Sequence, residues 1–380
     1  MNEFSLGVLA RSRKENEWRL PIHPQHFARI DDDLRGRIHL ERGYGERFGM
    51  SDQDLSPYVA GLHDRERLLA ECDVILLPKL QAEDLAEFRV GQIAWGWPHC
   101  VQDEQLTQVA IDRRQTLIAF EAMNHWTSNG GFALHVFHQN NEMAGYCSVL
   151  HTLEIVGSTG VYGRQMTAAV IGFGATARGA VTALESQGIH NVSVLTSRPT
   201  QAVSAPIHSA RIRQLVRVGS DEEALCVVTG AGRVPIAEFL AQHDIVVNCT
   251  LQDPNAPMMF VYEEDLSRFR PGSLIIDVSC DEGMGFDWAR PTSFKQPTFV
   301  VGDNICYYAV DHSPSYLWNS ATWVISEALI PYLRTVLAGR DAWEADQTVR
   351  RAIEIRDGVI ENPAILTFQE RSPYYPHPKL

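Results

Sequence analysis

The sequence lacks an apolar run long enough to cross a membrane, and it lacks an excess of positive charge. Its longest apolar stretches, such as 244–248 and 273–278, are strand-sized, whereas a membrane span needs roughly 20 residues. The 47 acidic and 33 basic residues give a formal net charge of -14, which repels nucleic-acid phosphates and anionic lipids. No basic segment followed by a long apolar run opens the chain. We therefore expect a soluble, cytoplasmic protein that binds neither nucleic acid nor membranes.

Metal-binding patterns are missing as well. The seven cysteines are scattered, with no CxxC pair, and no clustered histidines complete a zinc site. Several cysteines lie in strand-like apolar runs, where a small buried thiol packs well. We expect reduced core thiols and no bound metal. Cys100, beside His99, is the one cysteine for which a functional role is left open.

Strands and helices alternate along the chain, as in parallel sheets covered by helices. A chain of 380 residues is too long for one compact core, so two α/β lobes are expected. The first lobe contains predicted strands, and a long helix predicted over 134–156 leads out of it. These strands are predicted over 3–9, 74–77, 92–95 and 116–120.

A glycine-rich turn follows the strand predicted over 167–171 and precedes a helix. It reads Gly172-Phe-Gly174-Ala-Thr-Ala177. In a dinucleotide-binding turn the first glycine permits the bend, the second lets the pyrophosphate approach, and a small third residue lets the helix pack on the strand. The pattern alone is weak, but a strand predicted over 192–195 completes the βαβ order. We expect a nucleotide site that includes Gly172, Gly174, Ala175, Thr176 and Ala177.

The acidic residue that usually ends the second strand of an NAD site is missing. The chain reads Thr196-Ser197-Arg198 instead, and a hydroxyl with a guanidinium suits a 2′-phosphate. We therefore favour NADP(H) over NAD(H), with a solvated loop arginine as the alternative. Thr250 follows the strand over 244–248, taken as the third, and is included among the cofactor-binding residues because ligands bind at strand ends.

Several further stretches, in their order, carry a resemblance to a known family. They are NEWRLPIHP at 16–24, ERGYG at 41–45, Lys79, GWPH at 96–99, AGY at 144–146, the glycine turn, IIDV at 275–278 and DHSPS at 311–315. With them the chain resembles the alanine dehydrogenase and pyridine nucleotide transhydrogenase superfamily from residue 5 to about residue 335, and most strongly N5-(carboxyethyl)ornithine synthase. The DHSPS segment is also similar to the lysine-forming saccharopine dehydrogenases.

The resemblance implies an architecture and roles for single residues. It implies two Rossmann-like doubly wound domains separated by an active-site cleft, a substrate domain of residues 1–133 and 312–380 and an NAD(P)-binding domain of residues 134–311. Arg19 would bind a substrate carboxylate, a role that its planar fork suits. Lys79 and His99 would form the acid/base pair or orient the carbonyl, and their two charges can depress each other's pKa; which is acid and which is base stays open. Asp281 matches an aspartate near nicotinamide and substrate.

The same resemblance implies an oxidoreductase that acts on CH–NH bonds. We expect NADPH-dependent reduction of the imine formed between a pyruvate-like keto acid and the side-chain amine of ornithine or lysine, an opine-type reaction. The alternatives are reductive amination with ammonia, a saccharopine dehydrogenase reaction, and a nucleotide-binding regulatory module without catalysis. A homo-oligomer is expected, with a dimer favoured. Beyond residue 335 we predict a helical region over 341–355 and a tail over 369–380 that binds a neighbour or docks on its own surface.

Overall fold

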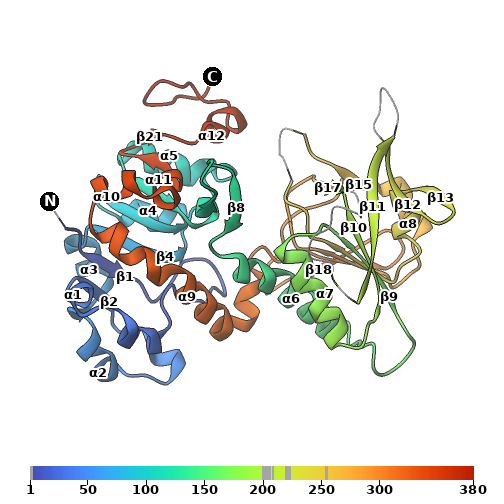
Figure 1. The fold of residues 1–380 in the computed structure, drawn as a ribbon, viewed down its shortest axis with the longest axis horizontal. Helices are drawn as coiled ribbons and strands as arrows, with labels where there is room; N and C mark the ends of the chain where they lie inside the picture. Colours follow the sequence, from blue (N-terminus) through green and yellow to red (C-terminus); the bar gives the residue numbers. More distant parts are fainter. Residues whose placement is uncertain (1–2, 199–206, 208, 219–223, 253–255) are drawn as a thin grey trace. The chain divides into compact units, whose positions relative to one another are not determined.

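The computed structural model describes residues 3–198, 207, 209–218, 224–252 and 256–380. The chain divides into two compact units, each built on one large, mainly parallel sheet (Figure 1). Unit 1 contains Met1–His138 and Leu317–Leu380, and unit 2 contains Gln139–Tyr316. The boundaries expected from the sequence lie a few residues earlier in both places. The predicted α/β class, with two Rossmann-like doubly wound sheets, is confirmed.

The sheet of unit 1 has the order β21-β20-β6-β5-β4-β1-β2-β3. The strands from β3 to β6 pair in parallel, and β20 and β21 extend the sheet in antiparallel fashion. The order reverses between β1 and β4, and in such sheets ligands bind near this switch point. The strands are β1 Leu6–Val8, β2 Ile38–Glu41, β3 Gly61–His63, β4 Val74–Lys79, β5 Ile93–Trp97, β6 Thr116–Ala119, β20 Ile353–Arg356 and β21 Val359–Ile360.

Helices bury both faces of this sheet. Along β4, Val74 and Leu76 join the core that includes α9, whereas Ile75 and Leu77 join the opposite core. This alternation follows from the two-residue period of a strand. The helices of the opposite face are α3 Arg65–Glu71, α4 Ala82–Glu87 and α5 Glu104–Asp112, and α9 spans Trp318–Leu337.

Unit 2 repeats the same parallel order around its own sheet, β13-β12-β11-β10-β9-β14-β16-β19-β18. The strands from β11 to β19 pair in parallel, and the order reverses between β9 and β14. The strands are β9 Thr167–Ile171, β10 Asn191–Thr196, β11 Ala210–Val218, β12 Ala224–Thr229, β13 Gly232–Pro235, β14 Ile245–Asn248, β16 Leu274–Asp277, β18 Thr298–Val301 and β19 Ile305–Tyr308.

Two helices of unit 2 approach each other through glycines. Helix α6 (His138–Ile155) and helix α7 (Ala175–Ser186) pack on one face of the sheet. A Cβ on Gly145 would lie 2.0 Å from the Thr176 carbonyl oxygen, and one on Gly179 would lie 1.8 Å from the Glu142 carbonyl oxygen. Only glycine permits this contact, which holds the first turn of α7 against α6.

Several local predictions were wrong. The region predicted as helical over 341–355 forms α10 (Arg340–Ala345) and α11 (Gln347–Arg351) but ends in strand β20. The strand over 244–248 is not third in its sheet, because β11 takes that place and pairs in antiparallel fashion with β12, which in turn pairs with β13. The long helix begins only at His138, after the hairpin of β7 (Asn124–Trp126) and β8 (Phe132–His135).

The C-terminal tail docks on unit 1. Gln369 donates from Nε2 to the Cys100 carbonyl at 2.7 Å, and the Ile360 amide donates to Nε2 of His377 at 3.1 Å. Burial raises the pKa of the Cys100 thiol well above its usual range, as expected for a core thiol.

In the described part of the chain, no helix is both long and apolar enough for a bilayer span.

We predict that Gly179→Ala destabilises unit 2 by about 1–3 kcal/mol, because the new methyl group must push α6 and α7 apart. Urea unfolding, with hydrogen exchange on peptides of both helices, measures this loss. Gly230→Ala is the control, since a Cβ there meets no atom within 4 Å. If the two variants unfolded at the same urea concentration, the proposed tight packing of α6 and α7 would be contradicted.

Candidate functional site

Lys79 and His99 lie together at the carboxyl ends of two neighbouring strands. Lys79 is the last residue of β4, and His99 follows β5 by two residues. The register between these strands shifts between Leu76 and Lys79, which indicates a bulge on β4. A Cβ on Gly96 would lie 1.9 Å from the Leu77 carbonyl oxygen, so the bulge needs glycine opposite it. The result is a contact of 2.9 Å between Lys79 Nζ and His99 Nε2.

Glu121 holds the backbone of His99, and sequence reasoning missed it. His99 has a φ of 50°, a left-handed conformation that is costly for a residue with a side chain. Its amide donates to Glu121 Oε1 at 2.7 Å, and the same oxygen lies 3.9 Å from His99 Nδ1. Glu121 follows β6, the next parallel strand. A polar residue at that strand end was the signal that could have identified it.

A second carboxyl group lies behind Glu121. Glu354 on β20 is buried and accepts hydrogen bonds from Asn362 Nδ2. Burial, together with the nearby charge of Glu354, raises the pKa of Glu121 to about 8. Burial also raises the pKa of Glu354. Since the two groups titrate together, the pair retains a proton near neutral pH.

The guanidinium of Arg19 is buried and binds a carboxylate of its own chain. Glu17 accepts from Nε of Arg19 at 2.8 Å and from Nη2 at 2.5 Å. The Arg19 guanidinium also lies 5.2 Å from the ring centroid of Trp97, the residue paired with Lys79 in the sheet. Sequence reasoning identified the guanidinium of Arg19 as a candidate anchor but missed Glu17, although Glu17 is part of the motif that contains Arg19. Arg19 therefore already shows the planar contact that a substrate carboxylate would make.

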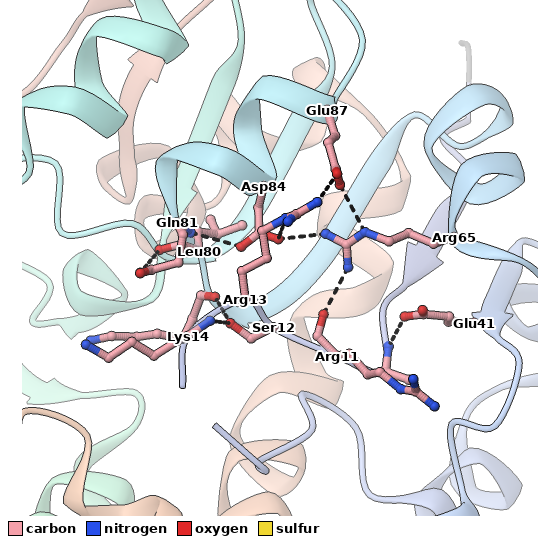
Figure 2. A network of polar contacts seen from close by, with 12 residues as sticks. Arg11, Ser12, Arg13, Lys14, Glu41, Arg65, Leu80, Gln81, Asp84 and Glu87 are labelled. Atoms are coloured by element: carbon pink, nitrogen blue, oxygen red, sulfur yellow. Dashed lines mark hydrogen bonds and ion pairs between the residues drawn. The ribbon is translucent and has the colours of Figure 1, made fainter. Parts of the chain in front are cut away.

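The segment after β1 is anchored to α4 and to Lys79. Figure 2 shows Arg13 and Arg65 converging on Asp84 and Glu87. Arg65 Nη2 lies 2.6 Å from Asp84 Oδ1, and Asp84 is fully buried. From this segment Ser12 donates its hydroxyl to the Lys79 carbonyl at 2.6 Å. These contacts fix the strand end from which the Lys79 side chain extends.

In unit 2 the glycine turn has the shape of a dinucleotide-binding loop. Gly172 has a φ of 112°, and a Cβ there would lie 2.9 Å from the Cys249 carbonyl oxygen. Gly174 is the N-cap of α7, and a Cβ there meets nothing within 4 Å, so space is open above the helix N-terminus. Ala177 is fully buried on the inner side of the helix. Ala175 and Thr176 form the first turn, whose amides suit a pyrophosphate.

The end of β10 presents the residues expected for a 2′-phosphate. Thr196 is buried and accepts a hydrogen bond at Oγ1 from the Arg198 amide at 3.2 Å. The side chains of Ser197 and Arg198 are exposed. These groups fit a phosphorylated ribose, because hydroxyls and a guanidinium donate to phosphate oxygens.

The ends of β14 and β16 are joined by a buried network centred on Asp277. Its carboxylate accepts from Asn248 Nδ2 at 2.9 Å and from the Tyr307 hydroxyl at 2.6 Å. Asn248 in turn accepts from the Thr250 hydroxyl at 2.6 Å. Burial raises the pKa of Asp277 to about 6. This network holds Thr250 at the end of β14.

Asp281 lies beyond the end of β16, after a strained residue. Cys280 has a φ of 47°, and its amide donates to Asp277 Oδ1 at 3.1 Å. Burial raises the pKa of Asp281, which favours its protonated form.

In the portion of the chain that the structure describes, no cluster of histidine, cysteine and acidic side chains could hold a metal ion.

Comparison with known proteins matches both halves of the chain to one family. The model of the alanine dehydrogenase/PNT N-terminal domain matches residues 7–144, and that of the C-terminal domain matches residues 143–363. The protein is therefore an oxidoreductase of the class that binds a nicotinamide cofactor. The chain belongs to the alanine dehydrogenase/PNT family.

Individual relatives carry two different names. The chain is 26% identical over 373 residues to an alanine dehydrogenase of Halomonas elongata, covering 93% of each protein. It is 25% identical over 342 residues to an N(5)-(carboxyethyl)ornithine synthase of Clostridium botulinum, covering 86% of this chain and 92% of the relative. A solved L-alanine dehydrogenase shares the fold with a TM-score of 0.73 at 20% identity, covering 96% of this chain and 98% of the other.

We predict that Glu121→Gln weakens the pH dependence of stability. The pKa of Glu121 rises from 4.5 to about 8 on folding, so the folded chain keeps a proton that the unfolded chain releases. The wild-type free energy of unfolding should therefore fall as pH rises from about 5 to about 8. The glutamine cannot ionise but still accepts from the His99 amide.

Urea unfolding at several pH values across this window measures the slope. Glu66→Gln, an exposed position, is the control. Identical slopes in the wild type and Glu121→Gln would show that the pair does not retain the proton.

Proposed function

We propose that the protein uses NADPH to reduce the imine formed between a pyruvate-like keto acid and the side-chain amine of an amino acid such as ornithine or lysine. The observation that carries this proposal is the contact of 2.9 Å between Lys79 Nζ and His99 Nε2 at the carboxyl edge of a parallel sheet. The name of the C. botulinum relative supports the opine-type reaction.

Imine formation requires proton transfers that a lysine–histidine pair can supply. The substrate amine attacks the keto-acid carbonyl, and the oxygen must gain protons before it leaves as water. Hydrogen-bonded to each other, Lys79 and His99 can receive one proton from the attacking amine and deliver two protons to that oxygen, one when the carbinolamine forms and a second, from the pair's own acid form, when water leaves. Glu121 keeps the imidazole in position through the His99 amide. When bound, NADPH supplies the hydride that reduces the imine carbon.

Arg19 is proposed to hold the keto-acid carboxylate. Its Nε and Nη2 groups already bind the two oxygens of Glu17, so a substrate carboxylate would share or replace this partner. Such an anchor fixes the carbon to be reduced, which is worth several kcal/mol of positioning in reactions of this kind. Asp281 is proposed as an additional proton-carrying group, since its raised pKa suits such a role.

The nucleotide is proposed to bind at the glycine turn of unit 2. Gly172, Gly174 and the first turn of α7 would hold the pyrophosphate, and Thr250 would contact the nicotinamide half. Thr196, Ser197 and Arg198 would bind the 2′-phosphate and so favour NADP(H). The residues fit this group because the Gly174 surface is open and no acidic side chain ends β10.

The second candidate function is reductive amination of pyruvate with ammonia. It is favoured by the H. elongata alanine dehydrogenase, which aligns with 93% of this chain. The DHSPS segment does not separate the two functions, because Ser313 donates to the Ala144 carbonyl within unit 2 and His312 binds Asp311.

We predict that the purified protein oxidises NADPH when pyruvate is supplied with ornithine or lysine, and that Lys79→Met or His99→Gln lowers kcat by about 10²–10⁴-fold. Absorbance of the reduced nicotinamide measures turnover, and fluorescence titration should give an NADPH Kd close to that of the wild type. His190→Gln, on an exposed residue of unit 2, is the control. Turnover with ammonia alone would favour the second candidate, and unchanged kcat in both variants would remove these residues from the mechanism.

We further predict that Arg198→Asp lowers the ratio of kcat/KM for NADPH to that for NADH by about 10–100-fold, because a carboxylate repels the 2′-phosphate and suits ribose hydroxyls. Steady-state kinetics with both nucleotides measures the ratio. Arg233→Asp changes the charge of unit 2 equally at an exposed position on β13. The same fall in both variants would indicate a general charge effect without a direct contact.

A further inference from the structure

Unit 1 contains a cavity beside the candidate site that none of the roles above uses. It has a volume of about 690 Å³ and lies between the segment after β1 (residues 10–20) and residues 43–48. This size is typical of small-molecule sites. Two residues connect its wall to the catalytic groups. Glu17 binds the Arg19 guanidinium, and Ser12 donates to the Lys79 carbonyl.

Arg47 places a positive charge in the wall of this cavity and packs against aromatic rings. Its guanidinium lies 3.7 Å from the ring centroid of Trp18 and 5.5 Å from that of Trp318. Arg13, from the opposite segment, is instead bound to Asp84 and Glu87. Within the described ranges, Arg47 makes no ion pair with a carboxylate. A guanidinium stacked on an aromatic ring is held in one plane, while its N–H edges remain directed outward for a planar anion.

The cavity wall also carries negative charge, and one side of the cavity is anchored. Glu46, next to Arg47, is exposed on the same segment. The wall opposite is anchored through Ala10, whose amide donates to Glu41 Oε2 at 2.7 Å, and through the Arg13 contacts drawn in Figure 2. An arginine edge and a carboxylate on one wall, facing an anchored segment, suit a zwitterion, the charge pattern of an amino-acid head group.

We propose that this cavity binds the α-amino-acid head of the amine cosubstrate, with Arg47 contacting its α-carboxylate and Glu46 its α-ammonium group. The inference rests on the proposed function and names the part of the site that selects an amino acid over ammonia. The methylene chain of the cosubstrate would then lead past Ser12 and Glu17 toward Lys79 and His99, where the side-chain amine reacts.

The test is a comparison of Arg47→Ala with wild type on amines that have or lack the carboxylate. The KM for ornithine or lysine should rise by about 10–100-fold, the loss expected for one charge-assisted carboxylate contact. The KM for pyruvate should not change. The decarboxylated diamines putrescine and cadaverine should react poorly with the wild type, and Arg47→Ala should leave their kinetics unchanged. Arg47→Lys, which keeps the charge but not the plane, should recover only part of the affinity.

Arg42→Ala is the matched control, because Arg42 is an exposed arginine of the same region that pairs with Asp64 at 3.5 Å. Calorimetric titration of ornithine and putrescine repeats the comparison without turnover. Turnover with an amino acid but an unchanged ornithine KM and Kd in Arg47→Ala would overturn the cavity assignment and leave the proposed function intact. Turnover with ammonia alone, and no ornithine binding, would overturn both.

Discussion

The bulge in β4 is the constraint on which the candidate site of unit 1 depends. Upstream of it, Val74 and Leu76 face one core and Ile75 and Leu77 face the other. An extra residue between Leu76 and Lys79 breaks this alternation just before the strand ends. Pro78 lies within the irregular stretch, where the missing amide donor is tolerated. The bulge thus directs a lysine out of a buried strand and toward the histidine that follows β5.

In each unit, one loop residue after a parallel strand is held in a costly backbone conformation by an acidic side chain. His99 and Cys280 both have positive φ, which costs about 1–3 kcal/mol each for residues other than glycine. In each case the strained residue donates its amide to a carboxylate, Glu121 for His99 and Asp277 for Cys280. Burial raises the pKa of both carboxyl groups. In unit 1 an acid that follows β6 therefore fixes the loop after the neighbouring strand β5, and this loop carries His99. In unit 2 the acid that ends β16 fixes the loop after its own strand, and this loop precedes Asp281.

Sequence reasoning found the parts of this arrangement that leave a local pattern. The apolar runs that became β4, β5, β9 and β10 are short and end in polar residues or glycine, so these strands and Gly172 could be predicted, whereas Lys79 and His99 were indicated by the family resemblance. The antiparallel strand β20 was missed because it pairs with β6, which is distant in the sequence. Glu17 and Glu121 were missed for a related reason: their importance lies in the atoms they bind, Arg19 and the His99 amide, and no spacing in the sequence encodes those contacts.

The distinction between an amino-acid amine and ammonia has to arise outside the lysine–histidine pair. Both candidate reactions begin with attack of a nitrogen on a keto acid and need the same proton transfers, so the roles proposed for Lys79, His99 and Arg19 suit either one. A site for ammonia needs no further volume, whereas an amino acid requires space and charges for its head group. The cavity between residues 10–20 and 43–48 supplies both, and Glu17 lines it while binding Arg19. The Glu17 carboxylate therefore links the proposed keto-acid anchor, which is common to both reactions, to a cavity large enough for an amino-acid head group.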